Sequence, residues 1–137
     1  MHNRSLASDY LMRATHRLAA LDVLFDRESW ADVVRESQEV VELALKSLLR
    51  FSSIEVPRVH DVGQILRAES SKLPEGVRSH IDDLVATSRS LRRDRELAFY
   101  GSEDLTPSEF YQRPDAELAR TGARRVVEIV TAAITQT

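Results

Sequence analysis

Arg95 lies at a position where an amphipathic helix is normally apolar. When residues are placed at about 100° intervals from Val77, Arg95 falls at the centre of one stripe of the helix. The other members of this stripe are Ile81, Leu84, Ser88, Leu91, Ala98 and Phe99. A cation on the core-facing side of a helix requires a carboxylate, a phosphate or a hydrated cleft. Arg95 is therefore the first candidate for contact with an anionic ligand, and a structural ion pair with Glu39 or Glu42 is the alternative.

Arg95 belongs to a cluster of arginines, because Arg89, Arg92 and Arg93 precede it closely. Arg93 points roughly opposite the stripe, toward solvent, whereas Arg92 lies on its flank and can add a second cation to a ligand site. A second cluster consists of Arg120, Arg124 and Arg125. The formal net charge of −3 argues against a nucleic-acid surface over the whole domain. A local basic patch can still bind a small anion or a short run of phosphates.

Tyr100 follows Arg95 closely and is succeeded by Gly101, which ends the helical pattern. A tyrosine phenol ordinarily ionises near pH ~10, so it is a poor general base at neutral pH. It can nevertheless donate a hydrogen bond to a phosphate or stack on a nucleobase, and an aromatic side chain at the end of a bundle is the structural alternative. We therefore predict that Tyr100 contacts the ligand together with Arg95 and Arg92.

A polar row on an earlier predicted helix is the second candidate region for the site. Gln38, Glu42 and Lys46 are spaced at intervals of four residues beside an apolar stripe. Glu42 and Lys46 have the favourable order for a weakly stabilising surface ion pair. The row either lines a cleft, in which case Glu42 contacts the ligand, or it is an ordinary polar edge of an amphipathic helix.

The composition excludes several kinds of chemistry. The chain has no cysteine, so disulfides, thiol nucleophiles and cysteine-ligated metals are excluded. Its four histidines show no metal-ligand spacing, and there is no glycine-rich phosphate loop, so we expect neither a metal nor a cofactor. The start of the chain is polar, and no apolar run approaches the ~20 residues of a membrane span. We therefore expect a cytoplasmic protein that does not bind a membrane.

The apolar periodicity predicts an all-α protein with a single domain over residues 1–137. Helices are expected at residues 5–25, 30–51, 60–68 and 75–99, and from residue 114 onward. Asp26 is the expected N-cap of the second helix, and Thr106-Pro107-Ser108-Glu109 has the capping-box pattern of a further short turn. Helices of this length joined by such loops usually form an up-and-down bundle, here of four to five helices.

Two further expectations concern packing. Trp30 begins the apolar stripe of the second helix, so we expect it to be mostly buried against the first and fourth helices. The stripe of the final helix comprises Leu118, Ala119, Ala123, Val126, Val127, Val130 and Ile134. Ile129, Ala132 and Ala133 lie off that stripe, which is more apolar surface than one face can bury. This surplus predicts a second contact beyond the bundle.

Three blocks of the chain together resemble a known family. They are residues 36–46 (ESQEVVELALK), 56–62 (VPRVHDV) and 90–101 (SLRRDRELAFYG). In this order they are similar to the prokaryotic HEPN domain, whose name stands for higher eukaryotes and prokaryotes nucleotide-binding. The later Asp115-Ala116 and the apolar final helix fit as well, so the resemblance spans nearly the whole chain. It implies a helical bundle, usually a homodimer with a cleft between its protomers.

The resemblance also implies an activity. Members of the family include metal-independent ribonucleases, often the toxin of a toxin–antitoxin pair with a small nucleotidyltransferase. Their signature is an arginine that neutralises the scissile phosphate and, one to two turns later, a histidine that transfers protons. Arg95 matches the arginine, and Tyr100 occupies the position of the histidine. The resemblance thus implies that Arg95 and Tyr100 are the catalytic positions of a weakened ribonuclease that binds nucleotide or RNA.

A non-catalytic helical interaction module is the alternative function. In that case the helices dock a partner such as a minimal nucleotidyltransferase antitoxin, and Arg95 forms a structural ion pair. The two functions predict different consequences of replacing Arg95, because a ligand arginine supports binding whereas a buried ion-pair arginine supports stability.

Overall fold

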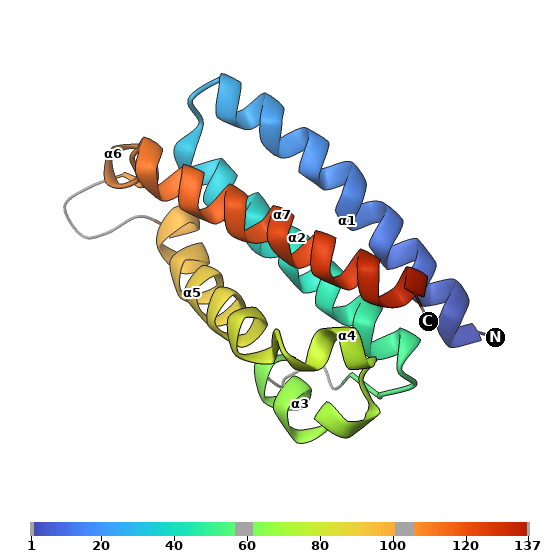
Figure 1. Cartoon of the computed structure of the whole chain (residues 1–137). Helices are drawn as coiled ribbons and strands as arrows, with labels where there is room; N and C mark the ends of the chain where they lie inside the picture. Colours follow the sequence, from blue (N-terminus) through green and yellow to red (C-terminus); the bar gives the residue numbers. More distant parts are fainter. Residues whose placement is uncertain (1, 57–61, 101–105, 137) are drawn as a thin grey trace.

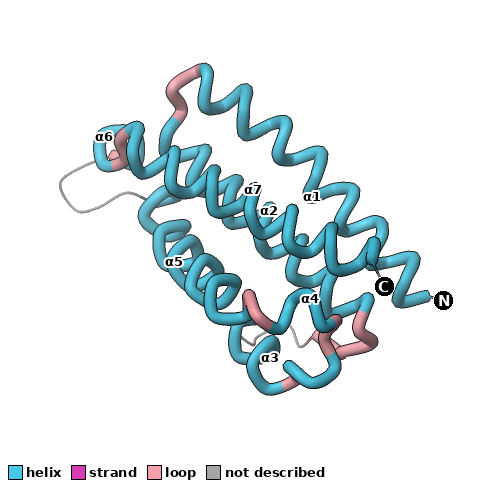
Figure 2. Tube along the Cα trace, viewed as in Figure 1, coloured by secondary structure: helices cyan, strands magenta, loops and turns pink. Residues whose placement is uncertain are grey.

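The computed structural model describes residues 2–56, 62–100 and 106–136, and only the backbone of residues 2, 93–100 and 136. Within these ranges the secondary structure is helical, and no strand is present (Figure 2). The long helices are α1 (His2–Asp26), α2 (Trp30–Phe51), α5 (Ile81–Tyr100) and α7 (Arg113–Gln136). Successive long helices run in opposite directions, so α1 begins and α7 ends at the same end of the molecule (Figure 1). The predicted all-α, up-and-down bundle is confirmed.

α2 is the central helix because its buried face is wide. It packs against α1, α5 and α7, and 12 of its 22 residues are buried. The side chains of Val33, Leu45 and Leu48 have no exposed surface. A helix with such a wide buried face needs more than one neighbour. The width of this face allows α5, which carries Arg95, to pack against α2 together with α1 and α7.

Shorter helices connect the long ones, and they are α3 (Val62–Ala68), the 3-10 turn η1 (Ser70–Lys72), α4 (Glu75–Arg78) and α6 (Pro107–Phe110). The single helix expected at residues 75–99 is wrong, because it is interrupted between α4 and α5. In the interruption the His80 backbone N–H donates to the Val77 carbonyl oxygen at 2.8 Å. α4 packs against α7, whereas α5 packs against α2. The interruption thus allows Val77 and Ile81 to be buried against different parts of the core.

The sequence predicted one helix start correctly and another incorrectly. Asp26 is the last residue of α1, and Ser29 is the N-cap of α2. The intervening turn contains Glu28 with φ 59°, so the chain reverses after Asp26 instead of starting a helix there. The short helical turn and its Thr106 cap are confirmed at α6. The Glu109 backbone N–H donates to Thr106 Oγ1 at 3.3 Å, and the Thr106 hydroxyl donates to Glu109 Oε1 at 2.8 Å.

The placement of Leu118 on the buried stripe of α7 is wrong, because its side chain is 75% exposed. The buried face of α7 consists of Ala116, Ala119, Ala123, Val126, Val127, Val130 and Ala133. Leu118 lies one turn before Gly122, on the edge of α7 that faces α5. A Cβ atom on Gly122 would lie 3.2 Å from the Thr87 side chain of α5. Leu118 therefore stands beside the α5–α7 contact and not on the face directed at the core.

Trp30 is half-buried at the junction of α1, α2 and α7. Its ring meets Phe25 of α1 in an edge-on arrangement, with ring centroids 5.0 Å apart. The Arg113 guanidinium of α7 lies 5.7 Å from the centroid of the indole ring. The predicted contact with the first helix is confirmed, and the ring is partly buried against the core, as expected. A second described neighbour comes from the last helix. The predicted contact with the fourth helix stays a prediction, because the side chains of residues 93–100 lie outside the described ones.

Because Trp30 is only partly buried, Trp30→Ala should reduce the free energy of unfolding by about 1–3 kcal/mol. This is less than the roughly 3–5 kcal/mol typical of a fully packed tryptophan. Urea denaturation followed by far-ultraviolet circular dichroism measures the change. Val23→Ala, at a residue of α1 that is 61% exposed, is the control and should alter stability little. Equal losses in the two variants would contradict a packing role for Trp30.

Candidate functional site

The predicted ligand residues lie where the second half of α5 runs beside the first half of α2. The two helices are antiparallel and pack against each other, and α6 contacts both of them. On α5, Leu84, Ser88 and Leu91 are buried. Position 95 follows Leu91 by one helical turn and continues this core-facing row of the backbone. Arg95 thus occupies the next position in a row whose described members are buried.

The side chains of Arg95 and Tyr100 lie outside the residues whose side chains the structure describes. Both positions belong to α5, which ends at Tyr100. Their roles as ligand contacts therefore stay predictions. The Arg92 side chain is described; it is exposed, and it also interacts with the rest of the protein. Arg92 is accordingly a surface cation one turn before position 95.

Glu42 forms the predicted ion pair with Lys46 on the surface of α2. The carboxylate oxygen Oε1 lies 3.5 Å from Lys46 Nζ, and about a third of each side chain is exposed. A pair this open to solvent contributes little to stability. Glu42 remains accessible at the edge of α2. The ion pair with Lys46 leaves its proposed contact with a ligand as a prediction.

Two polar side chains on α2, Ser37 and Gln38, are buried, although the sequence indicated only that Gln38 belongs to a polar row beside the apolar stripe. Ser37 is fully buried and Gln38 is 5% exposed. Within the described part of the protein, Ser37 Oγ and Gln38 Oε1 have no hydrogen-bond partner. Buried polar atoms are nearly always paired, so each exception requires an explanation. A clue to their burial was present in the sequence, because the pair lies between two apolar runs, Val33-Val34 and Val40-Val41.

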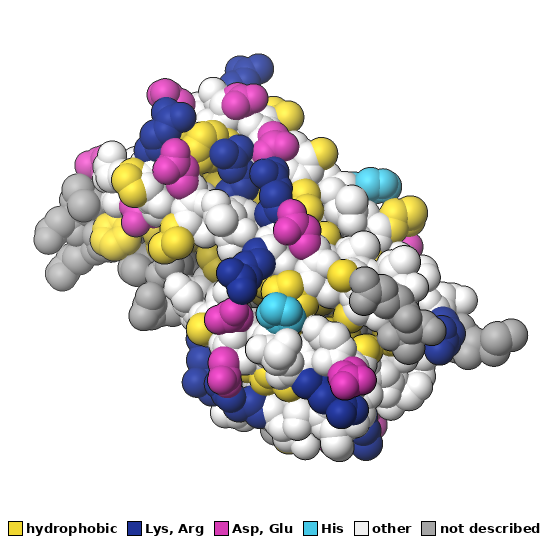
Figure 3. Space-filling view, in the orientation of Figure 1, with side chains coloured by type: hydrophobic (Ala, Val, Ile, Leu, Met, Phe, Trp, Pro, Cys, Tyr) yellow, Lys and Arg dark blue, Asp and Glu magenta, His cyan; other side chains and the backbone are white. Residues whose placement is uncertain are grey.

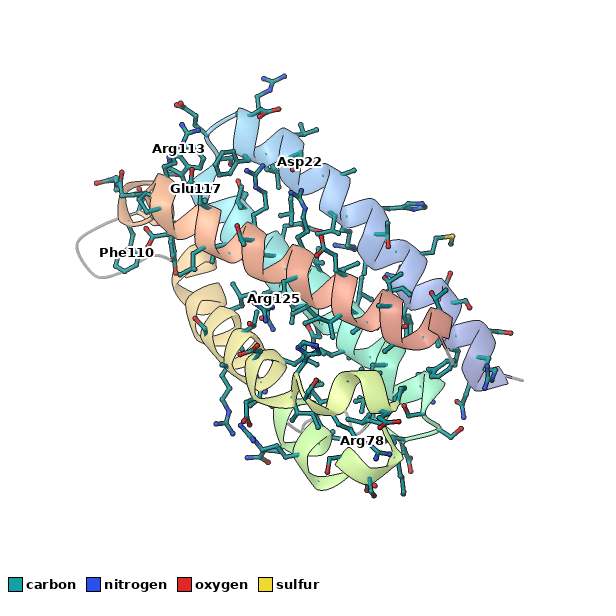
Figure 4. All side chains as sticks on the ribbon, in the orientation of Figure 1. Asp22, Arg78, Phe110, Arg113, Glu117 and Arg125 are labelled. Carbon is teal, nitrogen blue, oxygen red and sulfur yellow. The ribbon has the colours of Figure 1, made fainter. Side chains whose placement is uncertain are left out.

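The second arginine cluster is engaged in ion pairs within the fold. Arg120 and Arg124 of α7 each donate to Asp22 Oδ1 of α1 at 3.1 Å. Arg125 donates to Asp83 Oδ2 of α5 at 2.9 Å. In Figure 4, Asp22 lies between α1 and α7, and Arg125 extends from α7 toward α5. These arginines tie α7 to its neighbours and are weak candidates for a ligand site.

Aromatic rings hold two arginines of α7 in place as well. The Arg120 guanidinium carbon lies 3.7 Å from the centroid of the Phe25 ring, and that of Arg113 lies 5.2 Å from the same centroid. Arg113 also pairs with Glu117, with 3.3 Å between Nε and Oε1. Basic and acidic side chains are correspondingly mixed on the face shown in Figure 3. This face has no continuous basic patch of the kind that binds nucleic acid over a wide area.

Two other kinds of site were sought in the described residues. No group of three or more histidine, aspartate or glutamate side chains there is arranged to hold a metal ion. None of the described helices combines the length and apolar character needed to cross a membrane. A hollow of about 450 Å³ between α1 and α7 has a mainly apolar lining that includes Thr15, Val127 and Ala132. It contains no cluster of groups that could carry out chemistry.

Comparison with known proteins identifies the fold. The family model for the HEPN domain matches residues 7–133, which is nearly the whole chain. No curated protein and no solved structure matches the chain significantly.

Proposed function

Because the chain belongs to the HEPN domain family, we propose that it binds the phosphate of a nucleotide or RNA at the second half of α5. Arg95 supplies a planar fork of N–H donors to the phosphate, and Arg92 adds positive charge from the flank. Tyr100 contributes a hydroxyl donor or a stacking surface, and Glu42 borders the site from α2. The observation that carries the proposal is the position of Arg95, which continues the buried row of Leu84, Ser88 and Leu91.

The finer proposal is a metal-independent ribonuclease that acts as the toxin of a pair with a small nucleotidyltransferase. Arg95 would stabilise the charge that develops on the scissile phosphate. The missing histidine weakens proton transfer, because Tyr100 stands in its place. The tyrosine at this position also supports the alternative function, which is a non-catalytic helical module that docks a nucleotidyltransferase.

Fluorescence anisotropy of a labelled single-stranded RNA, titrated with the protein, tests the proposed binding. Saturable binding that weakens as salt is added is expected, because phosphate contacts release counterions. An RNA that stays free at low salt, even at high micromolar protein, would contradict the proposal.

The proposed site lies in a cleft between two copies of the chain. The surplus apolar surface predicted on α7 is smaller than expected, since Ala133 is buried within one copy and Ile129 packs partly against its core. Leu118 and Ala132 remain exposed. We still expect sedimentation at micromolar concentration to give a species near twice 15.5 kDa. A monomer at that concentration would remove the cleft between copies from the proposal.

A further inference from the structure

Phe110 of α6 is an aromatic residue that the fold leaves 37% exposed. The other large apolar residues that the structure describes as exposed are Met12, Val23 and Leu118, and all three are aliphatic. Exposed apolar residues are common on protein surfaces, so exposure by itself gives Phe110 no role. What distinguishes Phe110 is the way in which its ring is held and the place at which it is held.

Local contacts restrain the ring of Phe110. Its backbone N–H donates to the Thr106 carbonyl oxygen at 3.0 Å, and Thr106 also caps α6 through its side chain. The ring meets that of Tyr111 in an edge-on arrangement, with ring centroids 5.0 Å apart. Tyr111 is 3% exposed, so it anchors this contact to the core. Because an edge-on neighbour covers at most one face of a ring, Phe110 has aromatic surface available to a ligand.

α6 places this ring beside the proposed phosphate site. α6 packs against both α5 and α2, and it lies at the end of the bundle where α5 finishes at Tyr100 (Figure 1). Phe110 extends from α6 on the side where α5 ends (Figure 4). Arg95 precedes Tyr100 by five residues, which is about 7.5 Å along the helix axis. The ring is therefore close enough to be met by a base of a strand whose phosphate is bound at Arg95.

The surroundings of Phe110 suit an uncharged ring better than a second phosphate. The preceding residue, Glu109, is a carboxylate whose Oε1 accepts from the Thr106 hydroxyl at 2.8 Å. Asp115, at the start of α7, accepts from the Gln112 backbone N–H at 2.9 Å. Like charges repel, so these carboxylates disfavour a phosphate beside the ring. A nucleobase is uncharged at neutral pH, and proteins commonly bind unpaired bases by stacking them on aromatic side chains.

We propose that Phe110 is a stacking platform for one base of a single-stranded RNA whose phosphate is bound at Arg95. This inference rests on the proposed function and adds a base-contacting residue to that site. Stacking uses the flat face that every base has, so it tolerates any base. It requires a base that is free to leave its neighbours, and bases within a duplex are not. The ligand class is therefore unpaired RNA, and a duplex of the same length should bind more weakly.

Phe110→Ala tests the inference with two labelled probes of equal length. One is a single-stranded RNA, and the other is the same strand with abasic sugars in place of its nucleosides. Fluorescence anisotropy measures both affinities per folded molecule. Binding of the RNA should weaken about tenfold, within the range for the loss of one stacked base. Binding of the abasic strand should change less than about twofold, because its phosphate contacts are kept. Equal weakening for the two probes would overturn the inference.

Phe110→Trp and Leu118→Ala are the matched controls. Phe110→Trp keeps an aromatic face, so its RNA affinity should stay within about threefold of wild type. Leu118 is 75% exposed and aliphatic, so Leu118→Ala should leave RNA affinity unchanged. A loss in Leu118→Ala equal to that in Phe110→Ala would overturn the inference, because apolar surface and not the aromatic ring would then be responsible. A lower sedimentation coefficient for Phe110→Ala than for wild type would also overturn it and assign the ring to a contact between copies.

Failure of this inference is distinguishable from failure of the proposed function. The melting temperature of Phe110→Ala should fall by about 5 °C or less, because part of the ring is already exposed, so the variant can be assayed folded. A wild-type protein that binds neither probe would overturn the phosphate site and the stacking role together. Wild-type binding of both probes, with RNA affinity unaffected in Phe110→Ala, would overturn the stacking role and leave the phosphate site in place.

Discussion

Replacing Tyr100 by histidine should raise the rate of RNA cleavage by about 100-fold or more. General acid–base catalysis by a positioned side chain contributes roughly 10²–10⁴-fold to a rate. An imidazole ordinarily ionises near pH ~6.5, whereas a phenol ionises near pH ~10, so only the imidazole exchanges protons readily at neutral pH. The substitution restores the spacing of the family signature at the end of α5, where Arg95 precedes it by more than one turn. Release of a fluorophore from a quenched RNA substrate measures the rate.

Tyr100→Phe is the control for this gain. It removes the hydroxyl without supplying an imidazole, so it should cleave no faster than wild type. Arg95→Met in the Tyr100→His background should abolish the gain, because the phosphate then loses its cation. Rapid cleavage by wild type, equal to that of Tyr100→His, would show that another group is the base. RNA binding without cleavage in both proteins would favour the non-catalytic module.

The helices could be predicted because the pattern that defines them is local. Apolar residues at helical spacing indicated each long helix, and the capping box at Thr106 and Glu109 indicated α6. The ion pair between Glu42 and Lys46 was predictable for the same reason, since both residues lie on one helix. The interruption before α5 was not, because the stripe from Val77 to Leu91 is continuous in the sequence and only packing against different neighbours divides it.

Features that depend on contacts between distant segments escaped prediction. Asp22 pairs with Arg120 and Arg124, about 100 residues later in the chain. No helical spacing connects them, so the second arginine cluster resembled a ligand site in the sequence. Gln38 was visible only as one member of a polar row. Its burial results from the position of α2 between α1 and α5, which depends on the whole bundle.

These contacts also separate the arginines by role. Those of α7 are held by carboxylates and by the Phe25 ring, with Arg120 24% exposed against Asp22. Their removal should change stability more than binding, because their partners belong to the fold. The arginines of α5 therefore remain the candidates for contact with an anionic ligand. Three of them, Arg92, Arg93 and Arg95, lie in residues 90–101, one of the three blocks that resemble the family. A test of the proposed function should therefore compare one arginine from each helix.

Arg95→Lys should weaken binding of single-stranded RNA by about tenfold or more and leave the melting temperature nearly unchanged. A lysine keeps the charge but offers one ammonium in place of a planar fork, so it cannot reproduce two parallel hydrogen bonds to a phosphate. Arg125→Lys is the matched control from α7. Arg125 pairs with Asp83 at 2.9 Å, and both side chains are about 60% exposed, so neither stability nor affinity should change much.

The same pair of measurements distinguishes a ligand arginine from a structural one. If Arg95 were paired with a buried carboxylate, losing its geometry would cost stability, and removing one partner of such a pair typically costs about 3–5 kcal/mol. For a chain of this length that corresponds to a fall in melting temperature of roughly 10 °C. A ligand arginine faces a site that is empty without RNA, so replacing this arginine changes the stability of the folded protein little. A large fall in melting temperature, with RNA affinity per folded molecule intact, would therefore assign Arg95 to the core and not to the ligand.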